Sequence, residues 1–218
     1  MSLIVAVKDD ADIVLASDGR VMNESSAILS EDSLKTLALN GDLCLGLAGQ
    51  TRAMKQVLSS LGIKCRSTHP IDLLGECQEA ACPIDVEYSD ARREITSVLS
   101  WMQRRSPPGS WIGQIPSVIL AGRDGDAPTL SRWGQPAWMG ESSTDGYCHA
   151  IVGSLPEVGS VAWRGLNRML KEERTTENAE TRLARAVRLC ARHFGASGPI
   201  NGNVFLRRLS TGFALSRG

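Results

Sequence analysis

Short apolar runs separated by polar or glycine-containing turns fill the first fifty residues. Leu3–Val7 and Ile13–Ser17 are rich in β-branched residues and flank a short acidic stretch, so they predict a hairpin. Leu34–Leu39 and Leu43–Leu47 flank Asn40-Gly41, a dipeptide typical of tight hairpin turns. Four strands that pair as hairpins predict an antiparallel sheet and argue against a doubly wound parallel one.

Helical periodicity begins after these strands. A helix is expected from Thr51, because apolar residues recur on one face and Gly62 supplies a stop. Further helices are expected from about Ser89 to Arg105, from about Val158, and from about Thr175 to Phe194.

The remaining strands fall between and after these helices. They are expected at Ser117–Gly122, Thr129–Trp133, Tyr147–Val152, Val204–Leu209 and Gly212–Leu215. We expect Trp133 and Trp138 to lie on a surface loop, where they either face a neighbouring subunit or pack within the chain. The order of strands, helices, strands, helices and strands predicts an α+β protein, a four-layer αββα sandwich of two antiparallel sheets. At 218 residues, one domain over 1–218 is expected.

The segment at about 64–88 does not follow this pattern. It carries Cys65, His69, Cys77 and Cys82, residue types that could hold zinc. The spacing lacks the paired C-x-x-C knuckle of zinc sites, so helical packing with buried thiols is the favoured interpretation. We expect neither a metal nor a cofactor.

Composition excludes several classes of function. Lys plus Arg and Asp plus Glu both number 24, so no basic footprint for nucleic acid is evident. Arginines recur at about one-turn intervals in the last predicted helix, and a solvated or subunit-facing stripe is favoured over a nucleic-acid surface; they are Arg182, Arg185, Arg188 and Arg192. Apolar runs are too short for a membrane span and no leader is evident, so a cytoplasmic protein with reduced cysteines and no membrane partner is expected.

The second residue offers candidate chemistry. If Met1 is removed, Ser2 presents a hydroxyl nucleophile and a free α-amine. An α-amino group titrates near ~8, so it can act as the base for its own hydroxyl. Asp18 ends an apolar strand and Lys35 interrupts an apolar segment, so both could point toward the terminus.

The order of these motifs resembles a known family. Ala16-Ser-Asp-Gly-Arg20, Lys35-Thr-Leu37, Leu47-Ala-Gly49 and Ala150-Ile-Val-Gly-Ser154 follow one another as in proteasome-type N-terminal nucleophile (Ntn) hydrolases. That family includes proteasome β subunits, HslV-type peptidases and bacterial proteasome homologues. The resemblance implies the Ntn-hydrolase fold.

The resemblance also implies a site and a function. Ser2 would be the nucleophile, Asp18 would hold Lys35 beside it, Gly49 would donate to the oxyanion, and Ser154 would bond near the amine. The implied activity is hydrolysis of peptide bonds in polypeptide substrates, inside a self-compartmentalised homo-oligomeric ring. An ATPase unfoldase as a further partner stays open.

Two departures keep other interpretations open. Ser2 stands where threonine is usual, and the family's late Asp has no clear counterpart within Arg192–Gly202. A catalytically inactive ring or shell subunit, or an Ntn amidase acting on a small molecule, are the alternatives. Taken singly, Asp18 could form a turn, Lys35 could lie on a strand edge, and Ser154 could cap a helix.

Overall fold

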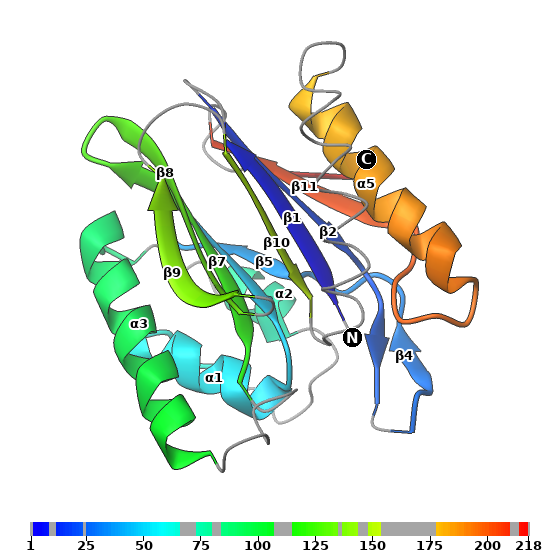
Figure 1. Cartoon of the computed structure of the whole chain (residues 1–218), viewed down its shortest axis with the longest axis horizontal. Helices are drawn as coiled ribbons and strands as arrows, with labels where there is room; N and C mark the ends of the chain where they lie inside the picture. Colours follow the sequence, from blue (N-terminus) through cyan, green and yellow to red (C-terminus); the bar gives the residue numbers. More distant parts are fainter. Residues whose placement is uncertain are drawn as a thin grey trace.

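The computed structural model describes residues 2–8, 12–23, 25–65, 73–79, 84–106, 115–134, 137–143, 148–153, 178–209 and 214–217. Within these ranges the strands form two five-stranded antiparallel sheets and one two-stranded ribbon (Figure 1). The first sheet has the order β10 (Cys148–Gly153), β1 (Leu3–Lys8), β2 (Ile13–Asp18), β11 (Val204–Arg208), β12 (Ala214–Arg217). The second has the order β5 (Thr36–Ala38), β6 (Leu43–Ala48), β7 (Ser117–Asp124), β8 (Ala127–Gly134), β9 (Ala137–Ser143). The ribbon pairs β3 (Val21–Met22) with β4 (Ile28–Ser30).

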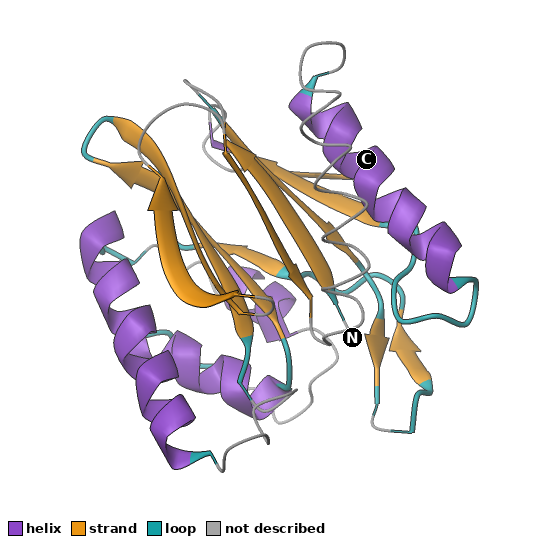
Figure 2. Ribbon diagram, in the orientation of Figure 1, coloured by secondary structure: helices purple, strands orange, loops and turns teal. Residues whose placement is uncertain are grey.

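The helices lie on the outer sides of the sheets (Figure 2). The second sheet packs against three of them, α1 (Thr51–Ser60), α2 (Leu73–Glu79) and α3 (Tyr88–Arg105). The first sheet packs against α5 (Ala179–Phe194) on the opposite side of the molecule. A third apolar cluster lies between the sheets and joins β1 and β2 to β6, β7 and β8.

Burial on both faces explains the unbroken apolar run of β1. Leu3, Val5 and Val7 contact the α5 side, whereas Ile4 and Ala6 face the second sheet. Alternate side chains of a strand point to opposite faces, so a strand between two layers is apolar at every position. Each large side chain buried there stabilises the fold by ~1.5–3 kcal/mol.

The predicted hairpins are confirmed. β1 pairs with β2 so that Ile4 lies opposite Ser17, and β5 pairs with β6 so that Thr36 lies opposite Gly46. The prediction of four strands before the first helix was wrong, because β3 and β4 also precede α1. These two strands are only 2 and 3 residues long, shorter than the four to eight residues by which a strand is recognised in a sequence.

The described helices agree with the periodicity. α1 begins at Thr51 as predicted, and Gly62 beyond its end has a φ of +79°, a conformation that favours glycine. α3 matches the predicted 89–105 helix within one residue. α5 begins at Ala179, about four residues after the predicted start near Thr175, because the Asn178 side chain accepts the Thr181 N–H and caps the helix there. The helix expected from about Val158 lies outside the described residues.

Two expectations about side-chain placement need correction. Trp133 is buried in β8 and contacts the apolar cluster under α1 to α3, because the strand continues through it to Gly134. The four arginines of the predicted stripe also differ in exposure. Arg185, Arg188 and Arg192 are exposed on α5, but Arg182 is buried.

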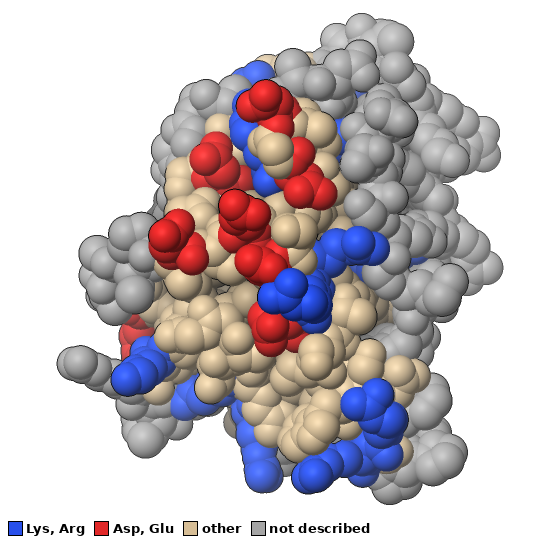
Figure 3. Space-filling model, turned by 90° about the vertical axis from the view of Figure 1, so that its left-hand side faces the viewer, with Lys and Arg blue, Asp and Glu red and all other residues tan. Residues whose placement is uncertain are grey.

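The described surface carries both signs of charge. Figure 3 faces the α3 side and shows acidic side chains in the upper part of this face, with basic side chains among them, and further basic side chains along its lower edge. α3 itself has Asp90 in its first turn and Arg104 and Arg105 in its last, which suits the helix dipole. In the described residues, no helix has both the length and the apolar character needed to cross a membrane.

Candidate active site

The ends of β1 and β2 bring Asp18 beside the second residue. The hairpin register places Leu3 opposite the end of β2, and the Leu3 N–H donates to Asp18 Oδ1 at 2.7 Å. The Arg20 N–H donates to Asp18 Oδ2 at 2.9 Å. Asp18 is fully buried and Ser2 is buried. The carboxylate is therefore fixed against the start of the chain by two backbone donors.

Lys35 supplies the positive charge of this site. Its Nζ donates to the carbonyl oxygen of Arg20 at 2.9 Å, two residues beyond Asp18, and the side chain is buried. Burial raises the pKa of the Asp18 carboxyl above its ordinary value, while the charge of Lys35 and the Leu3 N–H oppose that rise. The structure thus brings together three predicted site residues, Ser2, Asp18 and Lys35.

Gly49 lies at the end of β6, close to the Lys35 backbone. The Leu47 N–H donates to the Lys35 carbonyl oxygen at 2.9 Å, and Gly49 follows two residues later. Its φ of +150° favours glycine, and a Cβ there would lie 3.0 Å from Pro116 Cα. The backbone at this position therefore requires glycine. Its donation to an oxyanion stays a prediction.

The fifth predicted position, Ser154, lies outside the described residues. The preceding residue, Gly153, ends β10 and pairs with Leu3 of β1.

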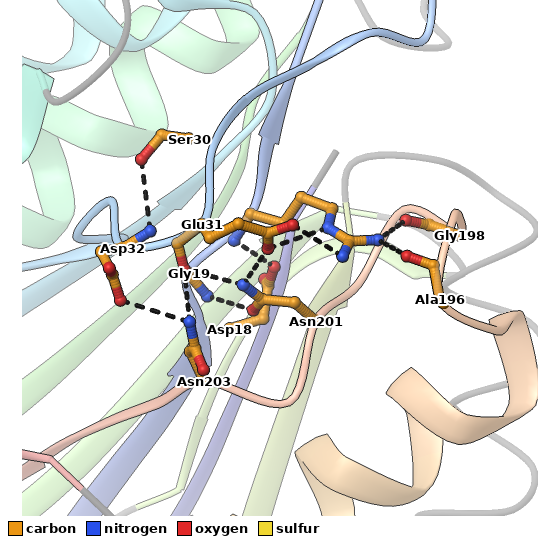
Figure 4. Close-up of polar contacts among 10 residues, drawn as sticks. Asp18, Gly19, Ser30, Glu31, Asp32, Ala196, Gly198, Asn201 and Asn203 are labelled. Carbon is orange, nitrogen blue, oxygen red and sulfur yellow. Dashed lines mark hydrogen bonds and ion pairs between the residues drawn. The ribbon is translucent and has the colours of Figure 1, made fainter.

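A polar network that the sequence did not indicate supports the turn after β2 (Figure 4). Asn201 Oδ1 accepts the Gly19 N–H at 2.9 Å, and Asn201 Nδ2 donates to the Glu31 carbonyl oxygen at 2.7 Å. Arg20 donates to the Glu31 carboxylate through Nη2 at 2.8 Å and Nε at 3.1 Å. This bidentate pair and Asn201 fix the backbone that holds Asp18 and the Lys35 acceptor.

Arg20 also attaches the segment after α5 to this turn. Its Nη1 donates to the carbonyl oxygens of Ala196 and Gly198, at 2.7 and 2.5 Å. Gly19 is closely enclosed, since a Cβ there would lie 2.3 Å from the Glu31 carbonyl oxygen. Only glycine fits at that position without moving the backbone.

Asn201 lies within Arg192–Gly202, the stretch that has no clear counterpart of the late Asp. No local pattern could have paired it with Gly19, which is 182 residues away. The contact arises because β11 pairs with β2, with Val204 opposite Asp18.

A buried arginine fixes the strand that follows Lys35. Arg207 of β11 donates from Nε to Thr36 Oγ1 at 3.0 Å and from Nη2 to the Thr36 carbonyl oxygen at 3.2 Å. The same Nη2 donates to Gln78 Oε1 of α2 at 2.9 Å. One guanidinium therefore joins the first sheet, β5 and α2 beside Lys35.

A pocket of about 760 Å³ lies beside the Arg20 network, along the end of α5. Its lining contains the side chains of Arg20, Arg188 and Arg192, together with Asn201. Ser2 and Lys35 are not among the lining residues. Among the described residues, no group of three or more His, Cys, Asp or Glu is arranged to hold a metal ion.

A positive charge held in this way can activate a hydroxyl that lies close to it. The Lys35 ammonium is buried near the buried Asp18 carboxylate, so its positive charge is shielded from solvent. Positive charge near a hydroxyl lowers its pKa and stabilises the alkoxide that forms on attack.

Comparison with solved structures identifies a similar fold. A crystal structure of eukaryotic HslV from Trypanosoma brucei superposes with a TM-score of 0.60, at 15% sequence identity, over 94% of this chain and 98% of that one. At this identity the similarity shows a common fold, in agreement with the antiparallel sheets and mixed α/β composition. No protein-family model and no curated protein sequence matches the chain.

Proposed function

We propose that the chain is a proteasome-like Ntn peptidase that uses Ser2 as its nucleophile after Met1 is removed. The observation that carries this proposal is the Asp18 carboxylate, bound to the Leu3 N–H at 2.7 Å with the Lys35 charge beside it. The HslV-like fold supports a four-layer αββα sandwich of the Ntn type.

The proposed reaction begins with attack of Ser2 Oγ on an amide carbonyl. The free α-amine of Ser2 accepts the hydroxyl proton, directly or through a water, and later returns it to the leaving amine. Lys35, held by the Arg20 carbonyl oxygen at 2.9 Å, stabilises the developing negative charge on Oγ. The Gly49 N–H donates to the oxyanion, where one such donor is typically worth ~3 kcal/mol. Ser154 hydrogen-bonds near the amine, and water then hydrolyses the acyl-enzyme on Ser2.

Asn201 has a positioning role in this scheme. It holds the Gly19 N–H at 2.9 Å and so fixes the turn between the Asp18 carboxylate and the Arg20 carbonyl oxygen. It occupies the late segment where the family has an acidic residue, but as a neutral amide. The terminal amine would therefore lack one acidic partner of the usual site.

The proposed setting is a homo-oligomeric ring that encloses unfolded polypeptide substrates, with an ATPase unfoldase as the partner that delivers them. The support is the fold shared with HslV over nearly the whole chain. Cytoplasmic localisation is part of the same proposal.

The alternative function is that of a ring or shell subunit without activity. Serine in place of threonine and Asn201 in the late segment both favour this alternative. A small-molecule Ntn amidase would share the site but differ in substrate.

Hydrolysis of fluorogenic peptides and an unfolded protein by the purified chain tests the proposal. We expect turnover that Ser2→Ala abolishes and that Ser25→Ala, an exposed serine in the turn before β4, leaves unchanged. Turnover that survives Ser2→Ala would exclude the proposed nucleophile. Cleavage of a small amide but neither polypeptide would favour the amidase.

A further inference from the structure

Two cysteines from different segments lie side by side at the apolar cluster between the second sheet and its helices. Cys65 follows the end of α1, Cys77 lies on α2, and their Sγ atoms are 3.1 Å apart. A disulfide bond is ~2.05 Å long, so a shift of about 1 Å would join them. Cys44 and Cys190, the other cysteines whose side chains the structure describes, are buried thiols.

The two thiols differ in access. Cys65 is half-buried, whereas Cys77 is buried. Burial, followed by the hydrogen bond to Cys65, raises the pKa of the Cys77 thiol to about 12, although Lys55 of α1 opposes the rise. Because Cys65 is the more exposed of the two, a solute reaches it first, and Cys77, with its Sγ 3.1 Å away, is placed to react with it next.

We propose that Cys65 and Cys77 are a peroxide-sensitive pair that forms a reversible disulfide. The Cys65 sulfur attacks one oxygen of hydrogen peroxide, the O–O bond breaks, and hydroxide leaves with the Cys65 proton as water, giving a sulfenic acid. The Cys77 sulfur then attacks Cys65 Sγ, the S–O bond breaks, and the departing hydroxide takes the Cys77 proton as a second water. Both sulfurs are oxidised by one electron each, and the two peroxide oxygens are reduced.

The disulfide would act on the support of Lys35. Gln78, next to Cys77, accepts the Ala38 N–H at 3.1 Å and the Arg207 Nη2 at 2.9 Å. Arg207 in turn holds Thr36, the residue after Lys35. A covalent bond from α2 to the chain after α1 would hold Gln78 against β5. Oxidation thus tightens the packing beside the proposed active site, by a reaction that does not use Ser2.

Mass spectrometry of the purified full-length chain tests this pair. The protein is treated with a small molar excess of hydrogen peroxide, denatured, alkylated and digested without reductant. We expect one cross-linked peptide pair containing Cys65 and Cys77, lost after dithiothreitol and lost in both Cys65→Ser and Cys77→Ser. Cys190→Ser, which changes a buried cysteine on α5, should keep the cross-link.

Thermal unfolding gives a second readout. Closing this loop should raise the unfolding midpoint of the oxidised wild type by about 5–10 °C, and dithiothreitol should reverse the rise. Ser2→Ala should show the same cross-link, so that the result is separate from the proposed peptidase activity.

The proposal is overturned if peroxide leaves both cysteines open to alkylation, or converts Cys65 to a sulfinic acid without a cross-link. A cross-link from either residue to Cys82 or Cys148 in place of this pair would also overturn it. Since the wild type alone gives these outcomes, a variant that fails to fold leaves the test intact.

Discussion

Replacing Lys35 by Met should expose how strongly the buried site depends on charge balance. Asp18 is fully buried and accepts the Leu3 and Arg20 N–H groups at 2.7 and 2.9 Å. Without the Lys35 ammonium, the carboxylate would keep these two neutral donors and the weaker influence of the N-terminal charge. Removing one partner of a buried ion pair typically costs ~3–5 kcal/mol. That loss is a large part of the ~5–15 kcal/mol that stabilises an ordinary domain.

The double variant with Asp18→Asn isolates the charge term. Asn removes the negative charge and keeps an acceptor for Leu3, but its amide faces the Arg20 N–H, which costs ~1–3 kcal/mol. Each single variant removes one member of the Asp18–Lys35 charge pair and leaves the other buried, whereas the double variant removes both charges. The double variant should therefore lose at least about 2 kcal/mol less than the sum of the two single losses.

The cost of Lys35→Met should also depend on pH. Burial already raises the folded-state pKa of Asp18, and loss of Lys35 raises it further. A carboxyl with a raised folded pKa destabilises the fold while it is ionised, so the penalty is full above that pKa. It fades as pH falls through the folded pKa toward the unfolded value of ~4.

Urea unfolding followed by circular dichroism measures these free energies, at pH 7 and at about pH 5 and a fixed protein concentration. Two results together would refute the pairing of Asp18 with Lys35. The loss in the double variant would equal the sum of the two single losses, and the cost of Lys35→Met would be the same at both pH values.

Three further predictions concern the turn that carries the site. Gly19→Ala should prevent stable folding or cost more than ~3 kcal/mol in urea unfolding, because its Cβ would lie 2.3 Å from a backbone oxygen, whereas Gly41→Ala has nothing within 4 Å and should be nearly neutral. Asn201→Ala should cost ~1–3 kcal/mol and lower peptide turnover, because the Gly19 N–H loses its acceptor. Asn203→Ala removes only exposed donors to the Glu31 carbonyl oxygen and Asp32 and should have a smaller effect on both; equal effects would contradict the positioning role. The side-chain hydrogen bond from Arg20 lowers the folded-state pKa of Glu31 below its ordinary value of 4.5. The Arg20–Glu31 pair therefore stabilises the fold above that value, and this stabilisation is lost as pH falls through the folded-state pKa. Glu31→Gln should therefore flatten the acid side of the stability curve, and an unchanged curve would contradict this assignment.

Local pattern was sufficient for one half of the site. The β1–β2 hairpin follows from two apolar runs and a short turn, and its register alone places Asp18 beside Leu3. Lys35 precedes a strand that the Asn40-Gly41 turn defines. Contacts between residues close in sequence depend on periodicity and turn chemistry, which a single sequence carries.

The other half depends on pairing between distant strands. Asn201 and Arg207 reach Gly19 and Thr36 only because β11 lies beside β2, more than 170 residues along the chain. An asparagine in a loop, or an arginine in a strand, gives no local signal of burial. Trp133 was misplaced because the glycine and proline after it suggested a loop, whereas β8 continues through Trp133 to Gly134.

The central claim is that Ser2 is a terminal nucleophile, and intact mass spectrometry with a peptide epoxyketone tests it most directly. This reagent requires both a terminal hydroxyl and the α-amine of the same residue. We expect a mass that lacks Met1 and gains one adduct, and for Ser2→Ala a mass without the adduct. A retained Met1, or a processed terminus that gains no adduct, would contradict it, and the second result would favour a subunit without activity.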